Sequence, residues 1–226
     1  MSVTERLHAA ARPIWDAQLD HPFVRGIGDG TLDPEVFQRW VVQDYGYLKE
    51  FSRIFAWAVA KAQRLDSMGW YARVLDMTLN TEMDLHRSYA ARFGISREEM
   101  ENAPMWPTTR AYTDFLVRTA ADGDMMDLLA ALLPCAWGYI HIGRALAAEE
   151  LPDDQRYRDW IELYASEEFG EAGEWLRAEL DREARGATPE KEGRLREIFL
   201  LSSRYELRFW DMCWEGESWE GVAEKE

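Results

Sequence analysis

Apolar residues recur every three to four positions along most of this 226-residue chain, which is the spacing of helices that bury one face. No stretch shows the sustained alternation of apolar and polar residues that is typical of a strand. Glycines and prolines fall between the periodic segments and form no long linker. The pattern predicts an all-α protein with a single domain, residues 1–226.

Start and stop signals bound the expected helices. Asp33 caps a long helix that has Pro34 at its first position, and Gly94 is a left-handed terminator further along. The expected helices lie near residues 3–19, 34–63, 67–93, a short stretch opened by the Ser96 and Glu99 capping box, the stretch from the Pro104–Pro107 loop to about Ala121, and residues 124–149, 154–164, 167–185 and 189–215. The glycine-rich stretch 21–32 is expected to turn, and an acidic tail covers about 216–226.

The segment 124–149 contains an unusual proline and thiol. Pro134 lacks the N–H of a helix ladder and costs about 3 kcal/mol in a helix interior, so a bend is expected there. Cys135 and Tyr139 are four residues apart and share one helix face. An isolated cysteine is more often a small buried hydrophobe, so this segment alone leaves both a structural and a reactive thiol open.

Two acids fall in apolar stripes on other expected helices. Asp44 shares a face with Tyr47, and Glu206 shares a face with Phe209 beside Tyr205. A carboxylate that leaves water loses several kcal/mol unless it is paired or hydrogen-bonded. The simple alternatives are an Asp bonded to a Tyr or Arg of a neighbouring helix, and a Glu at the surface edge paired with a nearby arginine.

Glu82 and His86 are spaced at i and i+4, as two metal ligands on one helix would be. Di-iron sites in helical bundles need four carboxylates and usually two or more histidines, and this chain has four histidines in all. A hydrogen-bonded helix histidine, or a supporting role for the pair behind a site, is the preferred interpretation.

Aromatic residues are abundant, with 11 Trp, 9 Tyr and 9 Phe. Most belong to the core, but we expect six to flank the acids and the thiol in the folded chain: Tyr47, Tyr112, Trp137, Tyr139, Tyr164 and Phe209. A flat heterocycle stacks between such rings while its nitrogens meet carboxyl and hydroxyl groups. These residues predict a pocket for an aromatic heterocycle.

Charge and cysteine content exclude several classes of function. The net charge of −16 repels nucleic-acid backbones and anionic lipid surfaces, which disfavours both as partners. We find no apolar run of the roughly 18 residues that span a bilayer. Two cysteines are too few for a disulfide framework, and the N-terminus lacks a signal-peptide core, so a cytoplasmic protein is expected.

Taken in order, these residues resemble the TenA family, the thiaminase II or aminopyrimidine aminohydrolase proteins of thiamin salvage, over nearly the whole chain. The matching motifs are His21-Pro22-Phe23 with Gly26-Ile27-Gly28-Asp29-Gly30-Thr31-Leu32, Gln43-Asp44 with Tyr47-Leu48, Glu82 with Leu85-His86, Leu133-Pro134-Cys135 with Trp137 and Tyr139, Trp160-Ile161 with Tyr164 and Phe169, and Ser202-Ser203 with Tyr205-Glu206 and Phe209-Trp210. Each motif is unspecific by itself, whereas the ordered set is specific.

The resemblance implies a haem-oxygenase-like helical fold without haem, assembled as a homotetramer. It also implies hydrolysis of 4-amino-5-aminomethyl-2-methylpyrimidine to the hydroxymethylpyrimidine and ammonia, with thiamin cleavage as a related activity. Cys135 resembles the nucleophile of the cysteine-containing branch, and Asp44 and Glu206 resemble the two essential acids. Tyr47, Tyr112, Tyr139 and Tyr164 resemble pocket residues. No metal or organic cofactor is implied.

Two other functions stay open at this point. One is a non-catalytic pyrimidine-binding or regulatory protein that keeps the same pocket. The other is a di-metal oxidase on the same helical scaffold, which would use Glu82 and His86 as ligands.

Overall fold

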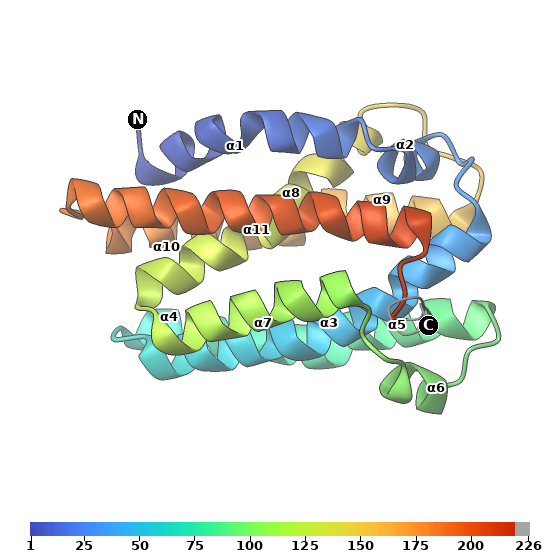
Figure 1. The fold of residues 1–226 in the computed structure, drawn as a ribbon, viewed down its shortest axis with the longest axis horizontal. Coiled ribbons are helices and arrows are strands. Elements are labelled where there is room, and N and C mark those ends of the chain that lie inside the picture. The colour runs from blue at the N-terminus through green and yellow to red at the C-terminus, as the bar shows by residue number, and fades with distance from the viewer. Residues whose placement is uncertain (220–226) are drawn as a thin grey trace, which may run out of the picture. The chain divides into compact units, whose positions relative to one another are not determined.

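The computed structural model describes residues 1–219, and every regular element in that range is a helix (Figure 1). The all-α prediction is therefore confirmed. The helices are α1 (Val3–Leu19), α2 (Pro22–Gly28), α3 (Pro34–Lys61), α4 (Leu65–Met77), η1 (Thr78–Glu82), α5 (Met83–Arg92), α6 (Arg97–Asn102), α7 (Pro107–Asp122), α8 (Met125–Ala147), α9 (Gln155–Ala165), α10 (Glu167–Glu183) and α11 (Pro189–Glu215). Residues 220–226 of the expected acidic tail lie outside the described residues.

Local sequence explains where several helices begin and end. Ser96 and Asp124 each form a complete capping box, in which the side chain accepts from a backbone N–H three residues later and the acid at that position accepts in return. Gly94 and Gly216 follow helices with φ of +73° and +78°, which a side chain rarely adopts. These boundaries agree with the predicted ones.

The stretch 21–32 was predicted to turn, and this was wrong for most of it, because residues 22–28 form α2. His21 caps this helix by accepting from the Phe23 N–H at 3.1 Å, and proline follows at the first helical position. Gly28 lies close against α8, since an added Cβ would lie 2.8 Å from Cδ2 of the Leu146 side chain. Only Gly30, with φ of +76°, takes the turn conformation that the glycines suggested.

The segment 67–93 was predicted as one α-helix, and the structure interrupts it with a different winding. Between α4 and α5 lies η1, a π-helical turn over Thr78–Glu82. Such a turn inserts one extra residue into the helix and often marks a functional site. Glu82 is its last residue, directly before α5.

Backbone contacts divide the chain into two compact units. Unit 1 comprises residues 1–33 and 123–210, and unit 2 comprises residues 34–122 with the described residues from 211 to 219. Neither unit is one continuous stretch of chain. Unit 1 holds α1, α2, α8, α9, α10 and most of α11, and unit 2 holds α3 to α7.

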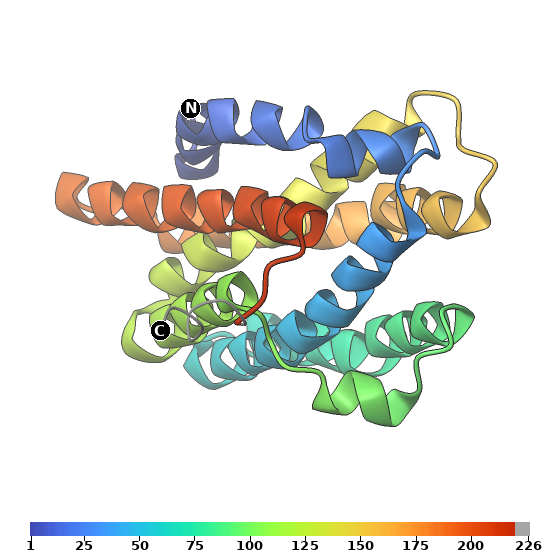
Figure 2. The ribbon, with the colours of Figure 1, turned by 45° about the vertical axis from the view of Figure 1, so that its right-hand side comes forward.

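In unit 1, α8 packs against α9 and α10, and α1 runs alongside α11 (Figures 1 and 2). Two indoles join α1 to α11: Trp15 Nε1 donates to Ser203 Oγ at 3.2 Å, and Trp210 Nε1 donates to Gln18 Oε1 at 3.1 Å. Both indoles are buried, so their N–H groups need these acceptors.

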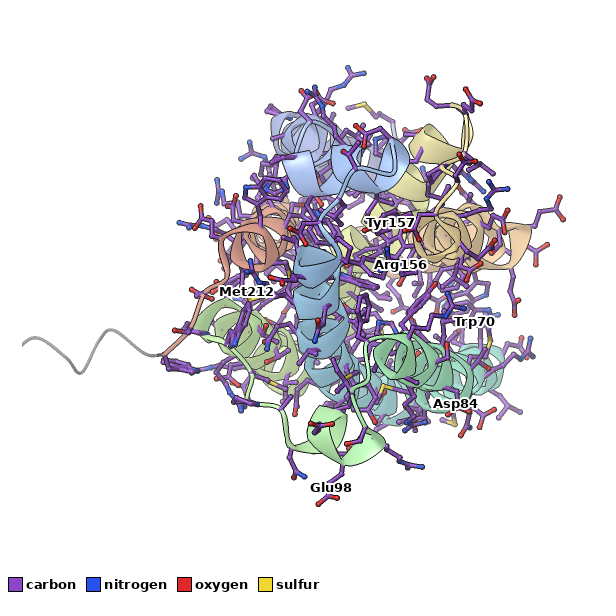
Figure 3. The ribbon with its side chains drawn as sticks, turned by 90° about the vertical axis from the view of Figure 1, so that its right-hand side faces the viewer. Trp70, Asp84, Glu98, Arg156, Tyr157 and Met212 are labelled. Atoms are coloured by element: carbon purple, nitrogen blue, oxygen red, sulfur yellow. The ribbon has the colours of Figure 1, made fainter. Side chains whose placement is uncertain are left out.

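The N-terminal turn of α9 is fixed to the chain that follows α2. Tyr157, labelled in Figure 3, donates its hydroxyl to the Leu32 carbonyl at 2.6 Å. The neighbouring Arg156 guanidinium lies 5.4 Å from the centre of the Tyr157 ring. Burial raises the pKa of the Tyr157 phenol, so it remains a neutral donor.

Among the described residues, α8 is the one helix long and apolar enough to cross a membrane. Asp127 and Arg144 bound the uncharged part of this helix. However, 67% of its most apolar window is buried inside the structure, and α9 and α10 pack against it. That burial is typical of the core helix of a soluble protein.

In unit 2, α3 packs against both α4 and α7. Gln43 of α3 fixes the loop before α7, because its amide donates to the Pro104 carbonyl at 3.1 Å and accepts from the Trp106 N–H at 2.8 Å. The same amide oxygen accepts from Thr109, whose hydroxyl also contacts the sulfur of Met212, labelled in Figure 3.

Candidate active site

Asp44 of α3 is 5% exposed, as its apolar stripe predicted. Its partner is neither the tyrosine nor the arginine of the simple alternative. His86 of α5 places Nε2 at 2.6 Å from Asp44 Oδ2, and the two side chains are 1% and 7% exposed. A carboxyl and an imidazole that share a bond away from water are arranged to exchange a proton.

Glu82 completes this group. The Glu82 backbone carbonyl lies 3.0 Å from His86 Nδ1, so the imidazole is held at both nitrogens. Burial, together with the charge of Asp44, raises the pKa of the Glu82 carboxyl to about 7, against the opposing effect of His86. Glu82 therefore titrates near neutrality, and the π-helical turn places it there.

His86 itself is tuned by competing effects. Burial by itself lowers the pKa of an imidazole, but the hydrogen bond and charge of Asp44, with the charge of Glu82, raise the pKa of His86 above its ordinary 6.5. The Trp40 ring lies 5.2 Å from the imidazole and helps to exclude water.

Two of the predicted pocket rings meet in unit 2. The centres of the Tyr47 and Tyr112 rings are 5.3 Å apart, and Phe51 stacks on Tyr47 at 5.4 Å. Tyr47 lies one turn after Asp44 on α3, and Tyr112 comes from α7. Unit 2 thus brings together Asp44 and two of the six predicted aromatic residues.

Unit 1 gathers a second group of rings around Tyr139 of α8. Tyr164 of α9 lies 4.7 Å from Tyr139, and Trp160 and Trp210 lie at 5.8 and 5.4 Å. Neither tryptophan was predicted as a site residue, although both stand in the matching motifs. Their signal was their spacing, since Trp160 and Tyr164 are one helical turn apart.

The predicted nucleophile and second acid also belong to unit 1. Cys135 is half-buried on α8 four residues before Tyr139, and neither Cys135 nor Cys213 forms a disulfide. Helix α8 continues through Pro134. Glu206 is 3% exposed, so the alternative of a surface-edge glutamate was wrong.

Three further predicted residues lie near these groups in sequence but differ in their surroundings. Phe209 is buried at 3% exposure, and Tyr205 is half-buried beside Glu206 on α11. Trp137 packs away from the Tyr139 rings: its ring lies 4.7 Å from His8, and the Arg177 guanidinium lies 4.0 Å from its centre.

Cys213 is a residue near Asp44 that sequence analysis did not place in the site. Burial raises the pKa of the Cys213 thiol well above its ordinary value, and the charge of Asp44 adds to this effect. It is therefore an unreactive thiol in unit 2. The sequence shows that Cys213 lies four residues after Phe209 on α11, but it contains no signal that Cys213 lies near Asp44.

The site offers little to a metal ion among the residues that the structure describes. No three His, Cys, Asp or Glu side chains there group as a metal site would. Both ring nitrogens of His86 point to oxygen partners, the Glu82 carbonyl and the Asp44 carboxyl. The Glu82 and His86 spacing is therefore explained by hydrogen bonding.

Comparison with known proteins covers almost the whole chain. The family described as TENA/THI-4/PQQC matches residues 8–216. An aminopyrimidine aminohydrolase of Halalkalibacterium halodurans is 45% identical over 97% of this chain and 98% of its own length. An aminopyrimidine aminohydrolase of Bacillus subtilis is 36% identical over 100% of this chain and 95% of its own.

Solved structures support the fold. A TenA homologue from P. horikoshii OT3 has a TM-score of 0.88 at 29% identity, covering 96% of this chain and 100% of its own. A domain from Shewanella denitrificans OS217, described as having a haem-oxygenase-like fold, has a TM-score of 0.69 at 15% identity, covering 94% and 92%. The predicted haem-oxygenase-like fold is confirmed.

Proposed function

The chain belongs to the TENA/THI-4/PQQC family, and from this premise we propose that it is an aminopyrimidine aminohydrolase. The reaction converts 4-amino-5-aminomethyl-2-methylpyrimidine and water to 4-amino-5-hydroxymethyl-2-methylpyrimidine and ammonia, with thiamin cleavage as a related activity. The support is similarity over nearly the full length to two chains named for this activity. The observation that carries the chemistry is the buried Asp44 bonded to His86.

In the proposed reaction, the Cys135 thiolate forms a C–S bond with an electron-poor ring carbon. The dearomatised ring then expels the amine, which Glu206 protonates as its C–N bond breaks. Water adds to the methylene carbon with Glu206 taking its proton, and the C–S bond breaks to restore the ring. Asp44 binds the aminopyrimidine edge.

Five of the six predicted aromatic residues complete the proposal as binding groups for the ring: Tyr47, Tyr112, Tyr139, Tyr164 and Phe209. Trp137, the sixth, contacts His8 and Arg177 instead. Tyr205 supports Glu206 from the neighbouring position. The contacts among Tyr47 and Tyr112, and among Tyr139 and Tyr164, favour stacking surfaces within each unit.

The proposal includes a cytoplasmic homotetramer that binds neither nucleic acid nor membrane. Exposed apolar side chains in unit 2 support an interface between copies, since Leu65 is 81% exposed and Trp57 is 40% exposed. The net charge of −16 supports the absence of nucleic-acid contact.

Ammonia release from the aminomethylpyrimidine tests the activity. We expect turnover by the unmodified protein, a loss of about a hundredfold or more in kcat for Cys135→Ser, and a comparable loss for Asp44→Asn. Asp84→Asn, on an exposed side chain of α5, is the matched control and should leave turnover unchanged.

Each outcome separates the candidate functions. Turnover that survives both substitutions would overturn the mechanism. Tight binding of the hydroxymethylpyrimidine without ammonia release would instead support the non-catalytic pyrimidine-binding protein. Activity that requires stoichiometric iron or manganese would favour the di-metal oxidase.

A further inference from the structure

His86 lies between two oxygen atoms of different kinds. Its Nδ1 is 3.0 Å from the Glu82 carbonyl oxygen, and its Nε2 is 2.6 Å from Asp44 Oδ2. A carbonyl oxygen only accepts, so Nδ1 must carry a hydrogen and donate it. The backbone of the π-helical turn therefore fixes the location of one ring proton.

One further proton belongs to the bond between His86 and Asp44. If Nε2 carries it, the pair is an imidazolium and a carboxylate; if Oδ2 carries it, the pair is a neutral imidazole and a carboxylic acid. In both forms the two residues hold a single mobile proton, and the Nδ1 hydrogen stays in place. The carboxyl and the imidazole thus share one proton across a single hydrogen bond.

The groups around this pair come from four elements. Glu82 ends η1, Cys213 lies near the end of α11, and Arg39 is on α3 with its guanidinium donating to the Cys213 carbonyl at 3.4 Å. The Tyr89 ring of α5 is 6.4 Å from His86. The charges of Asp44 and Glu82 raise the pKa of His86, which favours retention of the shared proton at neutral pH.

We propose that His86 is the positioning residue of Asp44 and that the two share one proton. The pair donates this proton to a ring nitrogen of the bound pyrimidine and accepts it back later in the reaction. This inference rests on the proposed function. As Cys135 forms its C–S bond, the displaced ring electron pair settles on a ring nitrogen, which takes the proton from Asp44. The pair is left as a carboxylate and a neutral imidazole, and the proton returns when the C–S bond breaks.

The substitution His86→Gln separates the positioning of Asp44 from the sharing of its proton. A glutamine amide can donate to Asp44 and hold it in place, but it cannot take up or release a proton. We expect kcat for ammonia release to fall about tenfold to a hundredfold with a much smaller change in KM. The alkaline limb of the pH profile should move to lower pH, because a carboxyl alone releases the proton more readily than an imidazole does.

The matched control is His141→Gln, which makes the same change at a half-buried histidine of unit 1. It should leave kcat, KM and the pH profile unchanged. A merely structural role of His86 predicts lower thermal stability in His86→Gln with an unshifted pH profile, and that result would overturn the proposal. An inactive unmodified protein would instead overturn the proposed function.

Nitrogen-15 NMR of the histidine side chains tests the shared proton without turnover. At pH 7 we expect the His86 signals to show a protonated Nδ1. Nε2 should either carry a proton or accept a hydrogen bond from the Asp44 carboxyl. The pKa of His86 should lie above the ordinary histidine value. A His86 ring that lacks the Nδ1 hydrogen at this pH would falsify the inference. The His141 signals supply the internal reference, since burial lowers the pKa of His141.

Discussion

Glu82 is a single residue whose protonation couples folding to pH. Burial raises its pKa from an ordinary 4.5 to about 7, so the folded chain holds this proton more tightly than the unfolded chain does. The stabilising effect is complete below pH 4.5 and is lost as pH rises through about 7. Above that pH the fold must accommodate a half-buried carboxylate.

Glu82→Gln mimics the protonated carboxyl at every pH. We expect its free energy of unfolding to be close to that of the unmodified protein at pH 5 and about 1–3 kcal/mol higher at pH 8. Urea unfolding at the two values measures this difference. Glu98→Gln, on the exposed side chain of α6 that Figure 3 labels, should show no such divergence, and a parallel pH dependence in all three proteins would contradict the assignment.

For single residues, the sequence predicted which acids are buried better than it predicted their hydrogen-bond partners. Asp44 and Glu206 were recognised because an acid interrupts an apolar stripe, and both are buried. The bond between Asp44 and His86 joins positions 42 residues apart on different helices, and spacing within one helix contains no information about it. Trp137 and Tyr139 are two positions apart on α8. Two positions along a helix correspond to a rotation of about 200° around its axis, which explains their separate ring contacts.

Helix ends were predictable at the scale of elements wherever capping chemistry was local. Ser96 and Glu99 form the expected capping box because the two partners are three residues apart. Asp124 and Asp127 form a second one with the same spacing. Helix α2 was missed because glycine weakens helix propensity, whereas its real determinants are a histidine cap and tight packing. The π-helical turn η1 has no comparable local signal in the sequence.

The packing of α8 on α9 depends on a close approach at one glycine. A Cβ added at Gly143 would lie 2.7 Å from the Tyr164 carbonyl carbon, a backbone atom that cannot move alone. Gly143→Ala should therefore lower the free energy of unfolding by about 2 kcal/mol or more and displace Tyr164. Thermal and urea unfolding measure the loss, and weaker substrate binding should accompany it.

Gly138, on the same helix, is the matched comparison for Gly143. A Cβ added there meets no atom within 4 Å, so Gly138→Ala should gain up to about 1 kcal/mol from helix propensity. Equal effects of the two substitutions would show that α9 does not constrain Gly143.

At the scale of the whole molecule, the two compact units could not have been predicted from composition. Each unit is assembled from distant stretches of chain, and α11 passes from one to the other near residue 210 without interruption. Linker signals such as proline- or serine-rich segments mark boundaries only where a domain is one continuous stretch. Asp44, Tyr47 and Tyr112 fall in unit 2, and Cys135 and Glu206 in unit 1.

The net charge of −16 is a property of the whole molecule, and it argues against direct binding to DNA as a regulator. Non-specific DNA binding comes mainly from cations that displace counterions from phosphates, with dissociation constants of about 10⁻⁴ to 10⁻⁶ M at physiological salt. We therefore expect no change in the fluorescence anisotropy of a labelled duplex at about 50 mM salt with tens of micromolar protein, with or without hydroxymethylpyrimidine. Binding that weakens steeply as salt is raised would contradict this expectation, because it requires a cationic surface strong enough to overcome the excess of 42 acidic over 26 basic side chains.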